Sequence, residues 1–126
     1  MQIVLLSVFG AAGVLGRYFI DLHLGKTAAG FPLSTLLINC LGSFLMGVVF
    51  VLSAQLALVS KEYSVAISIG LLGGFTTFSA FSIQSLQLIE QKQFSMAALY
   101  FVGSPMLGLL FAFIGVALAK SLVPLS

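Results

Sequence analysis

Four long apolar stretches, separated by short polar ones, follow one another along the chain. They cover about residues 3–22, 33–58, 65–89 and 94–118. A helix of about 20 residues can cross a hydrocarbon core of roughly 30 Å. The polar connections are short, so sequential helices should lie antiparallel. The pattern therefore predicts an all-α membrane protein with four transmembrane helices in one domain, residues 1–126.

The third apolar stretch is interrupted at its centre by residues 73–82, which read GGFTTFSAFS. Adjacent glycines lower helix propensity, and hydroxyl side chains compete for backbone hydrogen bonds. We therefore predict a break in the third helix from Gly73 to Thr77. At membrane depth, non-helical backbone is tolerated only inside protein or beside a water-filled or ion-filled cavity. Phe78 and Phe81 follow on one helix face, and the combination suggests an ion site.

The second and fourth stretches each carry a polar face at helical spacing. The second has Thr35, Asn39, Gly42, Ser43 and Met46, and the fourth has Tyr100, Ser104 and Gly108. An amide at mid-span needs partners in the protein interior or in a pore. For Asn39 the alternative is an interhelical hydrogen bond that stabilises packing. For Phe78 and Phe81 the alternative is packing in the core or against lipid.

Composition excludes several classes of protein. Hydrophobic residues make up 60% of the chain and charged residues 6%, far more apolar surface than a soluble domain of this size could bury. The net charge of +2 is too small for a nucleic-acid-binding surface. No nucleophile–base pair or metal-ligand cluster stands out, so we do not expect an enzyme. The apolar N-terminus lacks a positive leading segment and is interpreted as a retained span.

The basic residues are nearly balanced between the two sides of the membrane. Lys61 and Lys120 fall on one side, and Lys26, Lys92 and Arg17 on or near the other. The Lys/Arg bias of loops sets orientation, so this chain should insert both ways. We therefore predict dual topology and an antiparallel homodimer. Arg17, near the end of the first span, either extends to the headgroups or serves as a structural or vestibular charge.

The sequence resembles the Fluc/CrcB family of bacterial fluoride channels over nearly its whole length. Residues 73–82 are similar to the family signature Gly-Gly-x-Thr-Thr-Phe-Ser-x-Phe-Ser, the most specific of the matches. Residues 13–18 resemble its glycine-x-x-x-arginine-aromatic pattern, and residues 35–42 its Thr-x-x-x-Asn-x-x-Gly motif. Tyr100 and Ser104 fall where the family's fourth-span pore residues are expected.

The resemblance implies a passive fluoride channel in the bacterial inner (plasma) membrane, which lets cytoplasmic fluoride leave. The antiparallel dimer would hold two pores, each built from both subunits. The fluoride pathway would involve Phe78, Phe81, Asn39, Ser79, Ser82, Tyr100, Ser104 and Thr35. Backbone carbonyls of Gly73 and Thr76 would bind a structural sodium ion at the dimer interface. Arg17 would be structural or line a vestibule.

Three positions depart from the family pattern. Gln84 stands where the family often has Glu, Ala80 where it often has a hydroxyl residue, and Ser34 where it often has Gly. Gln84 removes any role that a carboxylate plays there. Ala80 removes one hydrogen-bond donor, which we expect to alter the rate more than the selectivity.

Two other functions remain as alternatives. A small four-span multidrug transporter needs a carboxylate within its first span, but the acidic residue of that span, Asp21, lies at its loop end, and the second and fourth spans contain no Asp or Glu. A non-transporting assembly subunit would explain the small residues in the spans, but not the polar faces at mid-membrane.

Overall fold

The computed structural model describes residues 1–123, and all regular structure in that range is helical. Four helices are long and apolar enough to cross a membrane: Gln2–Leu24, Leu33–Gln55, Lys61–Glu90 and Phe94–Leu122. The four predicted spans are thus confirmed as helices of spanning length. Only a small part of each is buried within the single chain, so most of the apolar surface faces outward.

The long helices divide into shorter elements. They are α1 (Gln2–Leu24), α2 (Leu33–Phe50), η1 (Val51–Gln55), α3 (Lys61–Val65), η2 (Ala66–Leu72), α4 (Gly73–Phe75), α5 (Phe78–Glu90) and α6 (Phe94–Leu122). The segments η1 and η2 are π-helical, which the apolar pattern does not reveal. α6 runs without interruption through Pro105.

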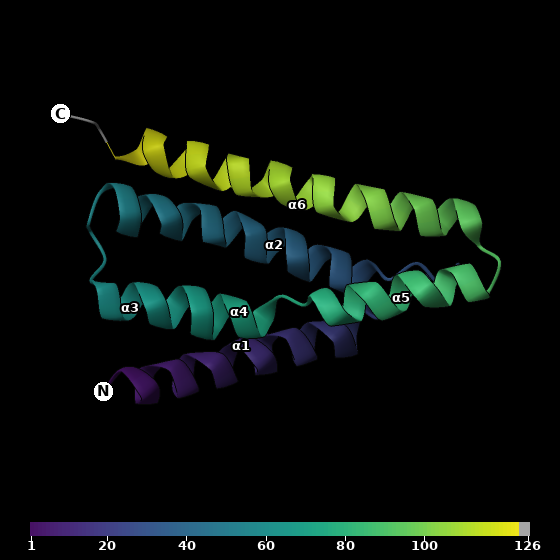
Figure 1. Ribbon diagram of the computed structural model, residues 1–126, viewed down its shortest axis with the longest axis horizontal. Coiled ribbons are helices and arrows are strands. Elements are labelled where there is room, and N and C mark those ends of the chain that lie inside the picture. Colours follow the sequence, from purple (N-terminus) through teal and green to yellow (C-terminus); the bar gives the residue numbers. More distant parts are fainter. Residues whose placement is uncertain (124–126) are drawn as a thin grey trace.

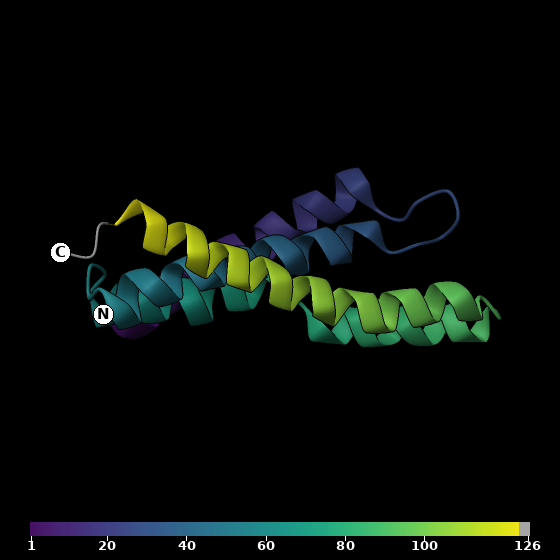
Figure 2. The same cartoon turned by 90° about the horizontal axis from the view of Figure 1, so that it is seen from above.

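The helices form an elongated bundle in which neighbours along the chain run antiparallel (Figure 1). α2 packs mainly against α6, and α1 packs mainly against η2 and α4. The start of α1 and the end of α6 lie at the same end of the bundle, which is where four crossings must place them. At the opposite end α5 and α6 lie side by side, and the loop between α1 and α2 projects away from the bundle (Figure 2).

Glycines set the distance between the packed helices. A Cβ atom on Gly47 of α2 would collide with the carbonyl oxygen of Ala112 in α6, and one on Gly115 of α6 would collide with that of Phe44. Gly13 of α1 faces the carbonyl oxygen of Leu71 in the same way. Glycine faces of this kind let membrane helices approach closely. The helix pairs α2–α6 and α1–η2 therefore depend on these positions having no side chain.

The connection between the second and third spans differs from the sequence expectation. The second helix ends at Gln55 instead of Leu58, and the third begins at Lys61 instead of Val65. Ser60 explains the early start, because its side chain accepts a hydrogen bond from the N–H of Tyr63 and caps α3. Ala57 has a positive φ of 51° in the tight connection.

Candidate functional site: a polar groove between α2, α5 and α6

A groove of about 580 Å³ lies along the middle of the bundle. Its walls come from α2, the junction of α4 with α5, and α6. The residues that line it include Asn39, Ser43, Thr76, Thr77, Phe78, Phe81, Ser104 and Pro105. Its lining includes no charged side chain. Amide, hydroxyl and aromatic groups thus meet in an open groove between apolar helices.

The backbone leaves helical geometry where the groove meets the third span. Thr76 (ψ 158°) and Thr77 (ψ 122°) are extended, and α5 begins at Phe78. Thr77 caps α5, since its hydroxyl accepts from the N–H of Ala80 at 3.2 Å. The sequence explains this start, because threonine is a favoured N-cap residue. Gly42 on α2 makes room for the junction, as any Cβ there would collide with the methyl group of Thr76.

Asn39 joins α2 to this junction through two hydrogen bonds. Its Nδ2 donates to the carbonyl oxygen of Thr77 at 3.0 Å, and its Oδ1 accepts from the N–H of Thr77 at 2.9 Å. The interhelical hydrogen bond considered from the sequence is therefore present. A carboxamide has two N–H groups, so the second remains available to the groove that Asn39 lines.

These hydrogen bonds also change the environment of two carbonyl groups. In an uninterrupted helix, the N–H of Thr77 would bond the carbonyl of Gly73, and that of Ala80 would bond the carbonyl of Thr76. Here the first N–H is bonded to Asn39 and the second to the hydroxyl of Thr77. The carbonyl oxygens of Gly73 and Thr76 therefore lose their usual helical partners.

Phe78 and Phe81 both line the groove, but their surroundings differ. Phe78 is 79% exposed, whereas Phe81 is 7% exposed. Their ring centroids are 5.9 Å apart at an interplanar angle of 40°. Phe81 also packs 5.1 Å from the ring of Tyr100 and stacks on Phe101 at 6.0 Å. Phe81 is therefore held by an aromatic cluster, while Phe78 projects from the surface of the single chain.

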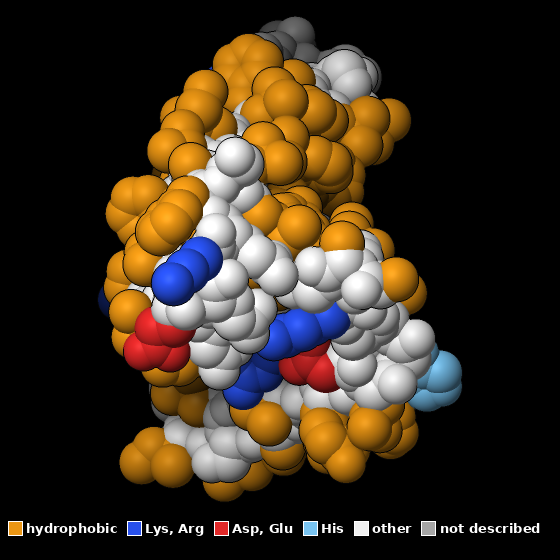
Figure 3. All heavy atoms as spheres, turned by 90° about the vertical axis from the view of Figure 1, so that its right-hand side faces the viewer, with side chains coloured by type: hydrophobic (Ala, Val, Ile, Leu, Met, Phe, Trp, Pro, Cys, Tyr) orange, Lys and Arg blue, Asp and Glu red, His pale blue; other side chains and the backbone are white. Residues whose placement is uncertain are grey.

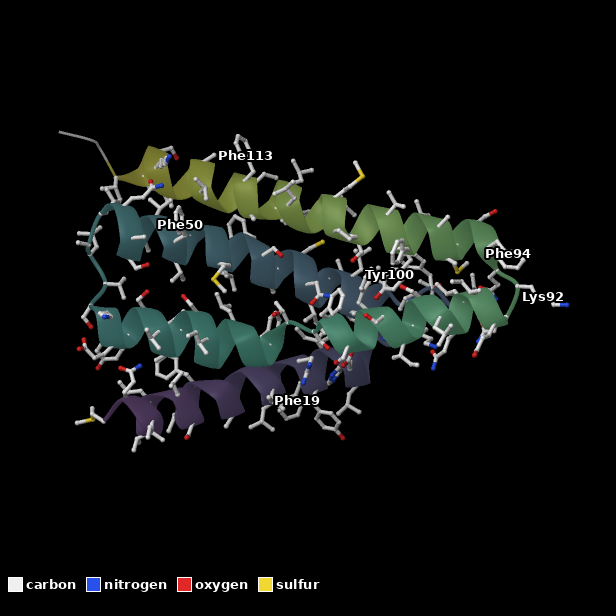
Figure 4. The ribbon with its side chains drawn as sticks, in the orientation of Figure 1. Phe19, Phe50, Lys92, Phe94, Tyr100 and Phe113 are labelled. Atoms are coloured by element: carbon white, nitrogen blue, oxygen red, sulfur yellow. The ribbon has the colours of Figure 1, made fainter. Side chains whose placement is uncertain are left out.

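A buried polar layer lies next to the groove, towards the α5–α6 loop. The hydroxyl of Tyr100 donates to Oε1 of Gln84 at 2.8 Å, and Nε2 of Gln84 donates to the hydroxyl oxygen of Thr35 at 2.9 Å. Tyr100 and Thr35 are almost fully buried. Figure 4 shows Tyr100 between α6 and α5. One residue from each of three helices thus forms a continuous hydrogen-bonded layer, which we call the polar layer.

The remaining predicted site residues lie elsewhere. Ser79 and Ser82 are exposed on α5 and do not line the groove, and the hydroxyl of Ser82 donates to the carbonyl of Phe78 at 3.0 Å. Arg17 is half-buried on α1 and is not part of the groove lining. The structure therefore brings Asn39, Phe78, Phe81 and Ser104 together, and places Thr35 and Tyr100 in the adjoining polar layer.

Sequence reasoning treated Gln84 only as a departure from a family pattern and missed its position as the centre of the polar layer. The signal was present in the helical spacing. Gln84 lies three residues after Phe81, Thr35 four before Asn39 and Tyr100 four before Ser104, so the three fall one turn away from the groove on their helices. Ser43 was assigned to the polar face and does line the groove.

The fold and the groove define a class: a small polytopic membrane protein with an uncharged polar site between its helices. Residues 4–116 match the family model described as CrcB-like protein, Camphor Resistance (CrcB), and the chain belongs to this family. A protein of Thermus thermophilus, named fluoride-specific ion channel FluC, is 46% identical over 120 residues, covering 94% of each chain.

Proteins of other bacteria with the same name are also similar. One of Oceanobacillus iheyensis is 40% identical over 118 residues, covering 94% of this chain and 91% of its own. One of Prosthecochloris aestuarii is 37% identical over 118 residues, covering 94% of this chain and 92% of its own. The similarity thus extends across all four membrane-spanning helices.

Proposed function

We propose that this chain forms a fluoride-selective, passive ion channel that lets cytoplasmic fluoride leave across the inner membrane. The observation that carries the proposal is the groove, in which Asn39, Ser104 and the rings of Phe78 and Phe81 meet without any charged group. The names of the similar proteins support fluoride as the permeant ion. Fluoride enters cells as HF and is trapped as the anion, so a leak driven by the membrane potential is sufficient for export.

The chemistry of the groove fits a small, strongly hydrated anion. Such an ion must replace its water with hydrogen-bond donors when it leaves bulk solvent. The second amide N–H of Asn39 and the hydroxyl of Ser104 supply donors, and the edges of aromatic rings carry partial positive charge. These groups attract an anion without the strong attraction of a full positive charge. Conduction requires this balance between favourable entry and easy exit.

The polar layer would extend the pathway beyond the groove. Thr35 and Tyr100 would interact with the ion through their hydroxyl groups, with Gln84 holding both side chains in place. Ser79 and Ser82 are exposed on α5, where a second subunit could turn them towards a pore. Arg17 would act as a structural or vestibular charge near the end of α1.

The channel would be an antiparallel homodimer with two pores, each formed by residues of both subunits. Two features support this arrangement. Phe78 is 79% exposed although it borders the groove, so a partner is needed to enclose it. The near balance of Lys and Arg between the two sides also favours insertion in both orientations.

Labelling of Cys substitutions at Lys61 and Lys92 with an impermeant thiol reagent tests the topology in intact cells. Each position should be labelled from both sides of the membrane. Labelling of one position only from outside and of the other only from inside would contradict dual topology.

A structural sodium ion would be bound at the dimer interface by the carbonyl oxygens of Gly73 and Thr76. These two groups fit the ion, because their usual helical donors bond Asn39 and Thr77 instead, and hard cations prefer oxygen ligands. Two subunits would supply four such oxygens around the interruption of the third helix. When bound, the ion would supply a fixed positive charge that holds the two subunits together.

Growth under fluoride tests the function in cells. Expression of this chain in a bacterium whose own fluoride exporter has been deleted should restore growth in fluoride medium, and expression of the Asn39→Ala variant should restore it less well. Failure of the wild-type chain to rescue growth, despite its presence in the membrane at the same level as a working fluoride channel, would contradict the proposal.

A further inference from the structure

The polar groups next to the groove continue in register towards one end of the bundle. The first level is the groove, with Asn39 of α2, Phe81 of α5 and Ser104 of α6. The second level is the polar layer of Thr35, Gln84 and Tyr100, one turn further along each helix.

The third level is the end of the bundle itself. Gln87 lies three residues after Gln84, and its Oε1 accepts a hydrogen bond from Nζ of Lys26 at 3.4 Å. Lys26 is thus the charged group that bonds the outermost of these polar side chains, at the solvent-exposed end.

The loop that carries Lys26 has a defined shape. The N–H of Thr27 bonds the carbonyl of Phe31 at 3.0 Å, and the hydroxyl of Thr27 accepts from the N–H of Phe31 at 3.1 Å. The ring of Phe31 packs edge-on against Tyr100, with centroids 5.5 Å apart. At the start of α2, Ser34 donates to a carboxylate oxygen of Asp21 at 2.6 Å. These contacts hold Lys26 over the end of α5.

Charged side chains gather at this end of the bundle among uncharged polar side chains and backbone, with apolar surface above and below them (Figure 3). The elements that meet here carry Arg17 and Asp21 on α1, His23 and Lys26 near its end, and Glu90 and Lys92 at the α5–α6 turn. One carboxylate, that of Asp21, is bonded to Ser34. Lys92 extends away from the helices (Figure 4). Lys26, in contrast, is hydrogen-bonded to Gln87.

We propose that Lys26 is a recruiting residue, which raises the local concentration of the permeant anion at the end of the line formed by Gln87 and the polar layer. The inference rests on the proposed channel function and adds a specific entry residue to it. A positive charge at the mouth of a low-dielectric pathway attracts anions and speeds their association. Its effect must weaken with salt, because the screening length falls from about 30 Å at 0.01 M to about 3 Å at 1 M.

The test measures fluoride efflux from proteoliposomes for the wild type, Lys26→Gln and the matched control Lys92→Gln, with an impermeant salt to set ionic strength. At about 10 mM ionic strength, Lys26→Gln should slow efflux about two- to fivefold, and the difference should largely disappear near 1 M. Lys92→Gln should conduct within about 1.5-fold of the wild type, because its side chain extends away from the helices, where the high dielectric constant of water weakens its field at the pathway. Lys26 is exposed, so its substitution leaves the fold intact.

A charge-replacement series separates electrostatics from shape. Lys26→Cys is made together with Cys40→Ala, which removes the single native cysteine. The Cys40→Ala variant alone must first conduct like the wild type. The new cysteine is modified in detergent before reconstitution. A trimethylammonium thiol reagent should restore the efflux lost with Lys26, and a sulfonate reagent should slow efflux further.

Three results would overturn the inference. The first is equal fluoride efflux of Lys26→Gln and the wild type at low salt. The second is an equal loss of efflux in Lys26→Gln and Lys92→Gln. The third is an equal effect of the trimethylammonium and sulfonate reagents on efflux. In each case a conducting wild type would leave the channel function standing. A wild type that passes no fluoride would overturn the proposed function and this inference with it.

Discussion

The carboxamide of Asn39 forms a two-point hydrogen-bonded pair with the backbone of Thr77, through its Nδ2 to the carbonyl at 3.0 Å and its Oδ1 to the N–H at 2.9 Å. Thr77 lies between α4 and α5, where helical hydrogen bonding stops. Asn39 thus supplies partners that the helix does not, and a polar backbone at membrane depth needs such partners.

Asn39→Ala should reduce both stability and fluoride conduction. Removal of the carboxamide leaves the N–H and carbonyl of Thr77 without these partners, which costs about 1–3 kcal/mol. Loss of the donor that we propose for the ion should slow efflux about tenfold or more, since a hydrogen bond to a charged group is worth about 1.5–3 kcal/mol. Thermal unfolding in detergent and fluoride efflux measure the two effects.

Ser53→Ala is the matched control for Asn39→Ala. Ser53 lies on the continuation of the same helix, where its hydroxyl bonds the carbonyl of Val49 at 2.6 Å, and it does not line the groove. It should conduct like the wild type. Normal fluoride conduction by Asn39→Ala would show that Asn39 serves helix packing and has no role in conduction.

The two phenylalanines should respond differently to replacement by isoleucine. Phe81→Ile removes ring contacts with Tyr100 and Phe101, so it should lower the free energy of unfolding by about 1–3 kcal/mol. Phe78→Ile should leave the stability of the single chain nearly unchanged, because the ring is exposed.

Both phenylalanine variants should slow fluoride efflux, because each loses an aromatic ring that lines the groove proposed as the pathway. Efflux assays on reconstituted protein, after folding is verified by size-exclusion chromatography, measure this loss. Unchanged efflux in both variants would exclude the aromatic rings from the pathway.

Tyr100→Phe tests the polar layer. The change keeps the ring that packs on Phe81 and removes the hydroxyl that donates to Gln84. Stability should fall by only about 0.5–1.5 kcal/mol, the usual net value of one hydrogen bond. Efflux should fall several-fold, because Gln84 loses the partner that fixes it. A variant with wild-type efflux would show that the polar layer has only a structural role.

Close packing of α2 on α6 can be tested at a single glycine. Gly47→Ala should destabilise the fold by about 1–3 kcal/mol, since its Cβ would collide with the carbonyl oxygen of Ala112 and force the helices apart. Gly103→Ala is the control, because nothing lies within 4 Å of a Cβ there. It should be neutral or slightly stabilising. Equal melting temperatures for the two variants would contradict the packing account.

The four helices and the groove residues on α2 and α6 could be predicted because both follow from periodicity. Apolar runs of spanning length gave the four helices, and spacings of three and four placed Asn39 with Ser43 in the groove and Ser104 one turn from Tyr100. The pairing of Asn39 with Thr77 could not be predicted, because it joins residues 38 positions apart and depends on helix packing. Gln84 was missed for the same reason, since its two partners lie on other helices.

The positions of Ser79 and Ser82 show that a sequence motif can also include residues that do not line the groove. Both belong to the motif at residues 73–82, yet both side chains are exposed on α5 and outside the groove lining. A motif reports which residues occur together, whereas the helix phase decides which of them face the groove.

The most direct test of the central claim is anion efflux from proteoliposomes, followed with fluoride and chloride electrodes under a potassium/valinomycin potential. The account predicts fast fluoride efflux that starts when the potential is imposed, with negligible chloride efflux from the same vesicles. Absence of fluoride efflux from well-folded protein, or chloride efflux at a comparable rate, would contradict it.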